Sequence, residues 1–271
     1  MMSASMPSLR LALVATLLLA SSTARADGYT LRAELDTHTH VVRGTERIVF
    51  TNRSARALDH LVFHLYMNAF NGDANVFMRE SRGQLRGVRR TNRGNIRVLS
   101  MRAGGHDLLR GANMEIVPDD RTQMRVRLPA PLAPGETITL DVRFVTTLPK
   151  VFARAGYEGE FHMVAQWFPK LAKLEPDGRF ESFPYHGDGE FYADFTNYHL
   201  TIVVAPAITI GASGRLVSRR SLPSGHIERV YIADRVHDVA FVASRSLTTL
   251  ERTCARVNVH TPVSYTHLRA H

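Results

Sequence analysis

The sequence predicts an all-β protein, in which antiparallel β-sheets pack face to face in a sandwich or saddle-like arrangement with at most one short helix. Three observations support this fold class. Apolar and polar residues alternate with a period of two in many segments, as they do in half-buried strands. Gly, Pro, Asn or Asp separates most of these segments, as expected for turns. No helical segments alternate with the strands, which argues against a parallel α/β sheet.

The expected elements begin with a long strand at residues 39–50, bent at Gly44. A second strand at 58–66 has one apolar face and one face that carries histidines. A short helix near 71–80 is the only helix that we expect. The A-P-G-E motif at 133–136 predicts a turn. The remaining strands are expected at 123–128, 137–144, 198–205, 207–212, 226–233 and 255–260.

The composition is that of an ordinary folded globular protein. The chain has 271 residues, of which 44% are hydrophobic and 22% are charged, and this argues against disorder, collagen and a coiled coil. A single cysteine, Cys254, excludes an intramolecular disulfide framework and a thiolate-rich metal site. The formal net charge of +9 comes almost entirely from arginine. Such a charge alone indicates nonspecific attraction, and we expect no nucleic-acid partner.

Residues 1–26 are expected to be a secretory signal peptide. Arg10 precedes an apolar run from Leu11 to Ala20, and the A-R-A motif at 24–26 has small residues where a signal peptidase reads them. The run is about half as long as the roughly 20 residues that span a bilayer, and an uncleaved anchor is the alternative. We expect cleavage near Ala26, a secreted or periplasmic location, and no membrane span after signal removal.

The last nine residues need a different explanation. Residues 263–271, V-S-Y-T-H-L-R-A-H, resemble a translated sequencing adapter. We therefore expect them to be an artefactual tail without defined structure. Residues 27–262 can then form one large β domain, which is either complete or the front part of a longer gene product.

Residues 79–97 form a strongly basic loop. They contain seven arginines and only one acidic residue, Glu80. One interpretation is a solvated surface insertion between strands, and the other is a contact loop for anions or lipid phosphates. The segment has no aromatic residue. It therefore lacks the side chains on which bases stack in proteins that bind single-stranded nucleic acid.

Two histidine pairs raise the question of a metal site. His60 and His64 have the spacing of the zinc motif H-E-x-x-H, but Leu61 stands where that motif has its glutamate. On the predicted strand, four residues span roughly 13 Å, which is too far for two ligands that each lie about 2 Å from one zinc. His38 and His40 would share one strand face, but no third ligand is evident. We expect no metal site in this chain.

An acidic cluster, Asp188, Glu190 and Asp194, could hold calcium or supply a carboxylate pair for acid–base chemistry. Its spacing matches no EF-hand loop, and its flanking glycines suit a turn equally well. The sequence has no G-x-S-x-G elbow and no P-loop, and Cys254 has no recognisable catalytic context. No catalytic residue is predicted.

Several motifs, in the same order along the chain, resemble the amino-terminal β domain of the aminopeptidase N family of zinc metallopeptidases, in its bacterial secreted branch. The resemblance covers roughly residues 29–260, and Val239 and Phe241 replace the Phe and Trp more usual in the family. These motifs are G-T-E-R-I-V-F-T-N at 44–52, L-Y-M-N-A-F at 65–70, L-A-P-G-E at 132–136, Q-W-F-P-K at 166–170, E-P-D-G at 175–178, E-F-Y-A-D-F at 190–195, Y-H-L-T-I-V-V-A-P at 198–206, A-S-G at 212–214 and V-H-D-V-A-F at 236–241.

The resemblance implies a truncated, non-catalytic domain. The family's chemistry requires H-E-x-x-H with a later Glu, and a Gly-x-Met-Glu-Asn strand that grips the free amine of the substrate; neither occurs here. In the full-length parent, zinc would polarise the peptide carbonyl while a glutamate activates water. The resemblance thus implies a missing catalytic domain as partner, a peptide substrate and zinc in the parent.

The resemblance also implies one substrate-binding residue. The family's β domain contributes a Gln or Glu side chain to the amino group of the substrate, about nine residues before the proline that corresponds to Pro169, and counting back leads to Glu160. The simpler interpretation is that Glu158 and Glu160 are solvated residues of a Gly-flanked loop.

A standalone envelope β-sandwich that binds partners without enzymatic activity is the alternative function. Its support is the lack of an active site and an aromatic cluster, although such aromatics are more often core or domain-interface residues than a ligand platform. The cluster consists of Trp167, Phe168, Phe191 and Tyr192.

Overall fold

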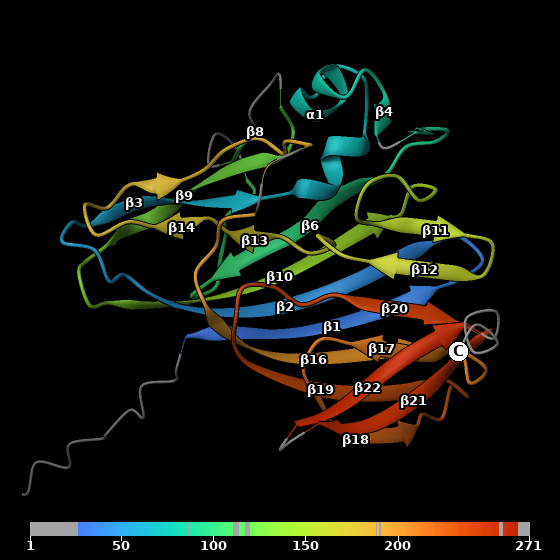
Figure 1. The fold of residues 1–271 in the computed structure, drawn as a ribbon. Helices are drawn as coiled ribbons and strands as arrows, with labels where there is room; N and C mark the ends of the chain where they lie inside the picture. Colours follow the sequence, from blue (N-terminus) through green and yellow to red (C-terminus); the bar gives the residue numbers. More distant parts are fainter. Residues whose placement is uncertain are drawn as a thin grey trace, which may run out of the picture.

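Almost all regular structure in the computed structural model is β-strand, so the predicted all-β fold is confirmed (Figure 1). The structure describes residues 27–85, 87–110, 114–116, 120–187, 189, 191–254 and 257–264.

The largest sheet forms the body of the molecule. Its strands are β1 (Gly28–Asp36), β2 (Val41–Thr51), β6 (Asn95–Ala103), β7 (His106–Asp107), β10 (Thr137–Thr147), β16 (Thr196–Val204), β18 (Arg215–Ser221) and β19 (Ile227–Val236). They lie in the order β18-β19-β16-β1-β2-β10-β6-β7. Side chains alternate between buried and exposed along β1, β2 and β10, so one face of this sheet supplies the core.

Two four-stranded sheets flank the body at opposite sides in Figure 1. One sheet has the order β13-β3-β9-β8 and the other has the order β11-β12-β20-β17. The strands of the first are β3 (Leu58–His64), β8 (Met114–Ile116), β9 (Gln123–Leu132) and β13 (Lys170–Leu171). Those of the second are β11 (Gly156–Glu158), β12 (Phe161–Val164), β17 (Thr209–Ala212) and β20 (Phe241–Ser244).

Three two-stranded pairs and two short helices complete the described chain. The pairs are β4 (Gln84–Leu85) with β5 (Val88–Arg89), β14 (Lys173–Leu174) with β15 (Phe180–Glu181), and β21 (Leu247–Cys254) with β22 (Val257–Ser264). The α-helix α1 (Val76–Glu80) lies within the segment where one short helix is expected. The 3-10 helix η1 (Tyr66–Phe70) follows β3, so the strand expected at 58–66 ends two residues early. No helix in the described part of the chain is both long and apolar enough to cross a membrane.

One strand pair departs from the antiparallel pattern. β1 and β16 run parallel, with Gly28 opposite Asn197 and Glu34 opposite Val203. β1 itself is absent from the predicted strands, although Leu31, Ala33 and Leu35 alternate with polar residues. Local periodicity predicts that a segment is a strand, but it carries no information on the direction of a partner far along the chain.

No register shift interrupts β2 at Gly44, the position where the sequence predicts a bend. β2 pairs continuously through Gly44 with both β1 and β10, and the only irregularity nearby lies between β10 and β6 at Arg143 and Phe144. A Cβ atom on Gly44 would lie 2.1 Å from Cζ of Phe144. The glycine is therefore required by the close approach of this buried ring, which occupies the space of a side chain.

The core is continuous between the large sheet and both smaller sheets, because one cluster of buried apolar residues includes members of all three. Trp167 belongs to this cluster, is fully buried, and contacts Phe144, Phe168 and Phe241 at ring-centroid distances of 5.9, 5.1 and 5.7 Å. Edge and tilted ring contacts of this kind add to the stability that comes from apolar burial.

The first two residues of the adapter-like tail have a defined structure. Val263 and Ser264 lie in β22, where they pair with Thr248 and Leu247, so the expected lack of defined structure is wrong for these two residues. The other residues of the adapter-like tail, 265–271, and the expected signal peptide, 1–26, lie outside the described residues.

Candidate functional site

The hairpin formed by β11 and β12 carries Glu160, the one residue for which a substrate contact is predicted. Gly159 turns the hairpin with φ +55°, a conformation that glycine adopts without strain. The Glu160 side chain is 64% exposed, and its Oε1 lies 3.7 Å from Nε of Arg245. The structure therefore presents this carboxylate to solvent at the tip of a hairpin. Its contact with substrate stays a prediction.

Two histidines anchor this hairpin to the large sheet. Nδ1 of His40, in the turn between β1 and β2, lies 2.9 Å from Nε2 of His162 in β12. Nδ1 of His162 lies 3.1 Å from the carbonyl oxygen of Glu160. A carbonyl only accepts, so His162 donates through Nδ1–H, and its Nε2 accepts a hydrogen bond from Nδ1–H of His40. The imidazole of His40 also stacks on Tyr157, with ring centroids 3.4 Å apart.

Both rings of this pair are neutral in the hydrogen-bonding pattern just described. Burial lowers the pKa of His162 and also that of His40. A proton added to Nε2 of His162 would reverse this hydrogen bond and require His40 to change tautomer, and two protonated rings would repel each other. Burial therefore favours the neutral form of both rings.

We expect the stability supplied by the His40–His162 pair to fall with decreasing pH. The folded pKa values are depressed, so the unfolded chain binds more protons below about pH 6.5, and stability is lost as pH falls through that value. Thermal unfolding between pH 8 and pH 5 measures the loss. The His40→Phe/His162→Phe double variant keeps aromatic rings and should lose less stability over this range. An equal loss in both proteins would contradict the assignment.

A partly buried polar cluster joins two of the motifs that carry the family resemblance. Nζ of Lys170 lies 2.8 Å from Oδ2 of Asp238, and Nε2 of Gln166 donates to the same oxygen at 2.7 Å. The indole nitrogen of Trp167 donates to the carbonyl oxygen of Val239 at 3.0 Å. The fold thus brings residues 166–170 and 236–241 together. The sequence analysis includes Asp238 in the motif at 236–241 but predicts no contact for it, because its partners lie far away in the sequence.

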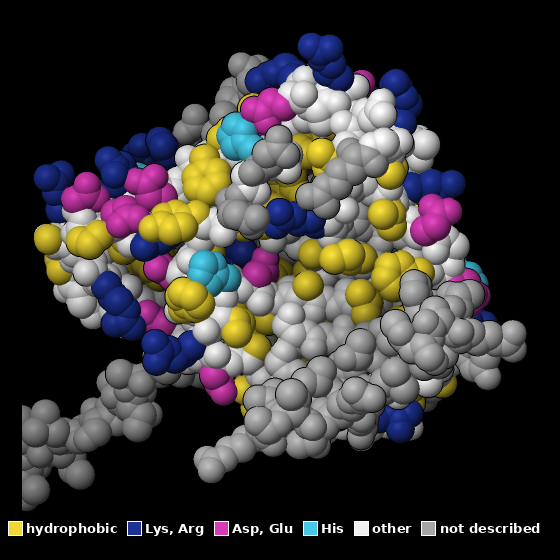
Figure 2. All heavy atoms as spheres, viewed as in Figure 1, with side chains coloured by type: hydrophobic (Ala, Val, Ile, Leu, Met, Phe, Trp, Pro, Cys, Tyr) yellow, Lys and Arg dark blue, Asp and Glu magenta, His cyan; other side chains and the backbone are white. Residues whose placement is uncertain are grey.

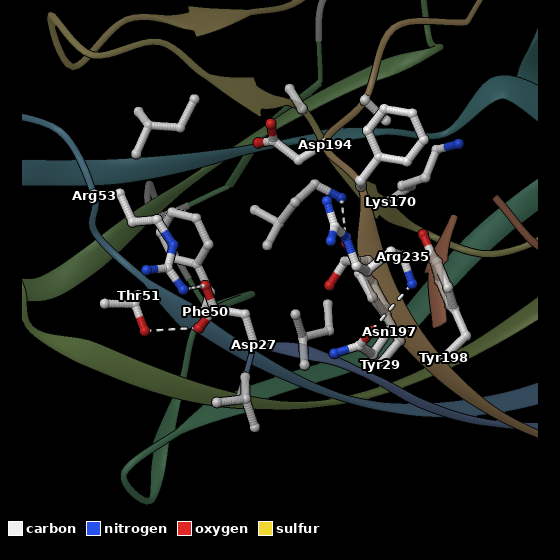
Figure 3. Close-up of a pocket in the computed structure, with 18 residues that line it drawn as sticks. Asp27, Tyr29, Phe50, Thr51, Arg53, Lys170, Asp194, Asn197, Tyr198 and Arg235 are labelled. Carbon is white, nitrogen blue, oxygen red and sulfur yellow. Dashed lines mark hydrogen bonds and ion pairs between the residues drawn. The ribbon is translucent and has the colours of Figure 1, made fainter. Parts of the chain in front are cut away.

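A groove of about 470 Å³ lies beside this cluster, between the large sheet and the segments around Lys170 and Asp194 (Figure 3). Tyr29 and Tyr198 line it and stack on each other, with ring centroids 5.0 Å apart. Its charged groups make structural contacts: Asp27 accepts from Thr51 and from Arg53, each at 2.7 Å. Two of its basic groups are paired, Arg53 with Asp27 and Lys170 with Asp238.

Asp194 is the one described carboxylate of the predicted acidic cluster. It lines the groove, and burial raises the pKa of its carboxyl group while the charge of Lys173 opposes that effect. Asp188 and Glu190 lie outside the described residues. The hypothesis of a calcium site or a carboxylate pair therefore has no test in the described part of the chain.

Of the two predicted histidine pairs, only His60 and His64 lie on a strand. His38 and His40 lie in the turn between β1 and β2, and His40 has a φ of +57°. The expectation that these two share a strand face is therefore wrong. His60 and His64 both lie on β3, as predicted. Burial, aided by the charge of Lys170, lowers the pKa of His64 to about 3. Among the described residues, no group of three His, Cys, Asp or Glu side chains could hold a metal ion.

The predicted aromatic cluster divides between core and surface. Trp167 and Phe168 are buried, in agreement with their interpretation as core residues. Phe191 is half-buried and contacts Tyr66 and Tyr185 at centroid distances of 4.9 and 5.0 Å. Tyr192 is exposed, and Nζ of Lys173 lies 4.7 Å from its ring centroid. These rings therefore do not form one continuous exposed platform.

The sheets define an all-β domain with one large sheet and two flanking sheets, and this architecture recurs in zinc metallopeptidases. The M1 zinc metallopeptidase from Deinococcus radiodurans superposes with a TM-score of 0.52 and 15% identity, over 87% of this chain and 46% of that chain. A mutant of that enzyme gives the same TM-score with 16% identity. The mutant bound to a Tyr-Ser-Ala substrate gives 0.52 and 15%.

At this level of identity the similarity shows the fold alone. The chain spans less than half the length of these peptidases. No protein-family model and no curated protein matches the chain.

Proposed function

We propose that this chain is the amino-terminal, non-catalytic β domain of a secreted zinc metallopeptidase of the aminopeptidase type. The observation that carries the proposal is the structural match, which takes in 87% of this chain but 46% of the peptidase chain. The contact between the motifs at 166–170 and 236–241 supports it, because residues chosen for their resemblance to that family pack against each other.

The domain would form one side of the substrate-binding cleft in the parent and would supply no catalytic residue. In the parent, zinc would polarise the peptide carbonyl, and that metal would be held by residues that this chain does not contain. The partner of the domain would be its own catalytic domain, and the substrate of the parent would be a peptide. Glu160 would reach the free amino group of that peptide, since its carboxylate is exposed at a hairpin tip.

The purified chain is expected to bind no stoichiometric zinc and to cleave no aminoacyl amide. The reason is the missing ligand set: His60 and His64 lie on one strand, and His64 is buried with neither ring nitrogen bonded to a described residue. Metal analysis after incubation with zinc and dialysis, together with an amide-cleavage assay, measures both outcomes. One tightly bound zinc per chain, abolished by His60→Ala, would contradict the proposal.

The native gene decides between the two candidate functions. A downstream H-E-x-x-H motif with a later Glu is expected if the chain belongs to a peptidase. A stop codon directly after codon 262 would instead support a standalone binding module. Sequencing the locus across codon 262 also tests whether the codons of residues 263–271 belong to the gene.

A further inference from the structure

Arginines of the basic loop converge on one pocket at the edge of the molecule. Figure 2 shows Lys and Arg side chains gathered at the top of the view, where Figure 1 places α1 and β4. The pocket there has a volume of about 470 Å³. Four arginines, one aspartate and two uncharged residues line this arginine pocket: Arg79, Arg82, Arg89, Arg90, Asp73, Met78 and Gly83.

Arg90 is held in place as the fixed member of the arginine pocket. Its side chain is 13% exposed and forms an ion pair with Asp73. One of its terminal nitrogens donates to the carbonyl oxygen of Asn92 at 3.3 Å. Its Nε is buried and has no hydrogen-bond partner among the described residues. This nitrogen is shielded from solvent, so Arg90 contributes to the pocket the positive charge of a guanidinium group that Asp73 and Asn92 hold in place.

The other arginines leave the pocket with an excess of positive charge. Arg82 and Arg89 are exposed and form no ion pair with another described residue. Arg79 donates to the carbonyl oxygen of Ala74, which carries no charge. The nearby Glu80 points to His186, with 2.8 Å between Oε1 and Nδ1, and does not line the pocket. Asp73 alone among the lining residues opposes four guanidinium groups.

We propose that the arginine pocket binds the phosphate group of a phosphate monoester. A phosphate dianion supplies two negative charges and three acceptor oxygens, and the planar fork of a guanidinium matches two of those oxygens at once. A carboxylate offers one charge and fewer acceptors, so it would neutralise the excess less well. No aromatic ring lines the pocket, which disfavours a nucleic-acid base stacked beside the phosphate.

Inorganic phosphate at pH 7.5 tests the pocket by calorimetric titration of the full chain. We expect saturable binding of one phosphate with a Kd below about 1 mM. The Arg82→Gln/Arg89→Gln variant should bind at least about tenfold more weakly, because it loses two charge-assisted contacts. Both side chains are exposed, so the variant should fold, and circular dichroism verifies this.

Two matched variants distinguish a specific phosphate site from nonspecific electrostatic attraction. Arg215→Gln/Arg219→Gln removes the same two charges from β18, where both residues are exposed, and should change the Kd by less than about twofold. Arg82→Lys/Arg89→Lys keeps both positive charges but removes the planar guanidinium groups that can bind two phosphate oxygens at once, and should weaken binding severalfold. Equal weakening by both Gln pairs would overturn the proposal, as would a failure to saturate below about 20 mM phosphate.

Vesicles distinguish a free phosphorylated molecule from a lipid headgroup. Phosphatidylcholine vesicles with and without phosphatidic acid are sedimented with the chain. Capture by phosphatidic acid that inorganic phosphate displaces identifies a lipid phosphate as a ligand. Phosphate binding without vesicle capture identifies a free phosphate monoester. Capture that phosphate does not displace would show a general electrostatic contact and would overturn the proposed site.

Discussion

Replacing Glu46 with Gln is expected to stabilise the chain at neutral pH, and the gain should increase with pH. Glu46 lies on β2, opposite Leu31 of β1 and Val142 of β10, and is 3% exposed. Neither carboxylate oxygen has a hydrogen-bond partner among the described residues. A carboxylate in such surroundings is costly unless it takes up a proton.

Burial raises the pKa of Glu46 well above its usual value. The folded chain therefore holds a proton that the unfolded chain releases above about pH 4.3. Stability is unaffected below that pH and is lost as pH rises toward the folded pKa, by about 1.4 kcal/mol for each pH unit. The Gln variant has no proton to lose, so its advantage over the wild-type chain should grow by that amount per unit within this window.

Urea unfolding of both proteins at pH 4, 5, 6 and 7 measures this difference, because groups common to both proteins cancel. Glu34→Gln is the matched control, since Glu34 is exposed on the neighbouring strand β1 and should change stability by less than about 0.5 kcal/mol. Glu46→Leu adds a second variant, which also removes the unpaired polar atoms. A difference that stays constant between pH 4 and pH 7 would show that the carboxyl group is not buried as described.

Glu46 also shows what periodicity can predict. Residues 39–50 alternate as a strand should, and β2 confirms the strand. In the structure Glu46 is buried on the same face of β2 as Val42 and Ile48. What alternation could not provide was the partner across the sheet. The ring of Phe144 explains Gly44, but it comes from β10, far along the chain.

The candidate site shows the same limit. The resemblance to the peptidase family implies Glu160, and the structure adds that its carboxylate is exposed and lies near Arg245. The contacts that anchor the hairpin were missed, because His40 and His162 are 122 residues apart in the sequence. The pairing of Lys170 with Asp238 was missed for the same reason. Short motifs indicate which residues matter, whereas long-range packing decides which of them meet.

Replacing Glu160 with Ala in the full-length peptidase is expected to lower kcat/KM for an aminoacyl amide roughly tenfold to a hundredfold. This expectation rests on the proposed function. A charge-assisted hydrogen bond between a carboxylate and the substrate ammonium contributes about 1.5–3 kcal/mol. The side chain is solvent-exposed, so its removal should leave the fold intact, and the loss should reflect binding of the substrate amine.

Two controls make this result specific to Glu160. Glu158→Ala removes a carboxylate from the end of β11 in the same hairpin, where it is also exposed, and should leave kcat/KM within about twofold. Glu160→Gln keeps a hydrogen-bond acceptor but loses the charge, so its loss should be smaller than that of Glu160→Ala. The preference for a free over an acetylated amino terminus should fall in Glu160→Ala alone. An unchanged preference, or equal losses in Glu158→Ala and Glu160→Ala, would show that Glu160 is only a solvated residue of the hairpin.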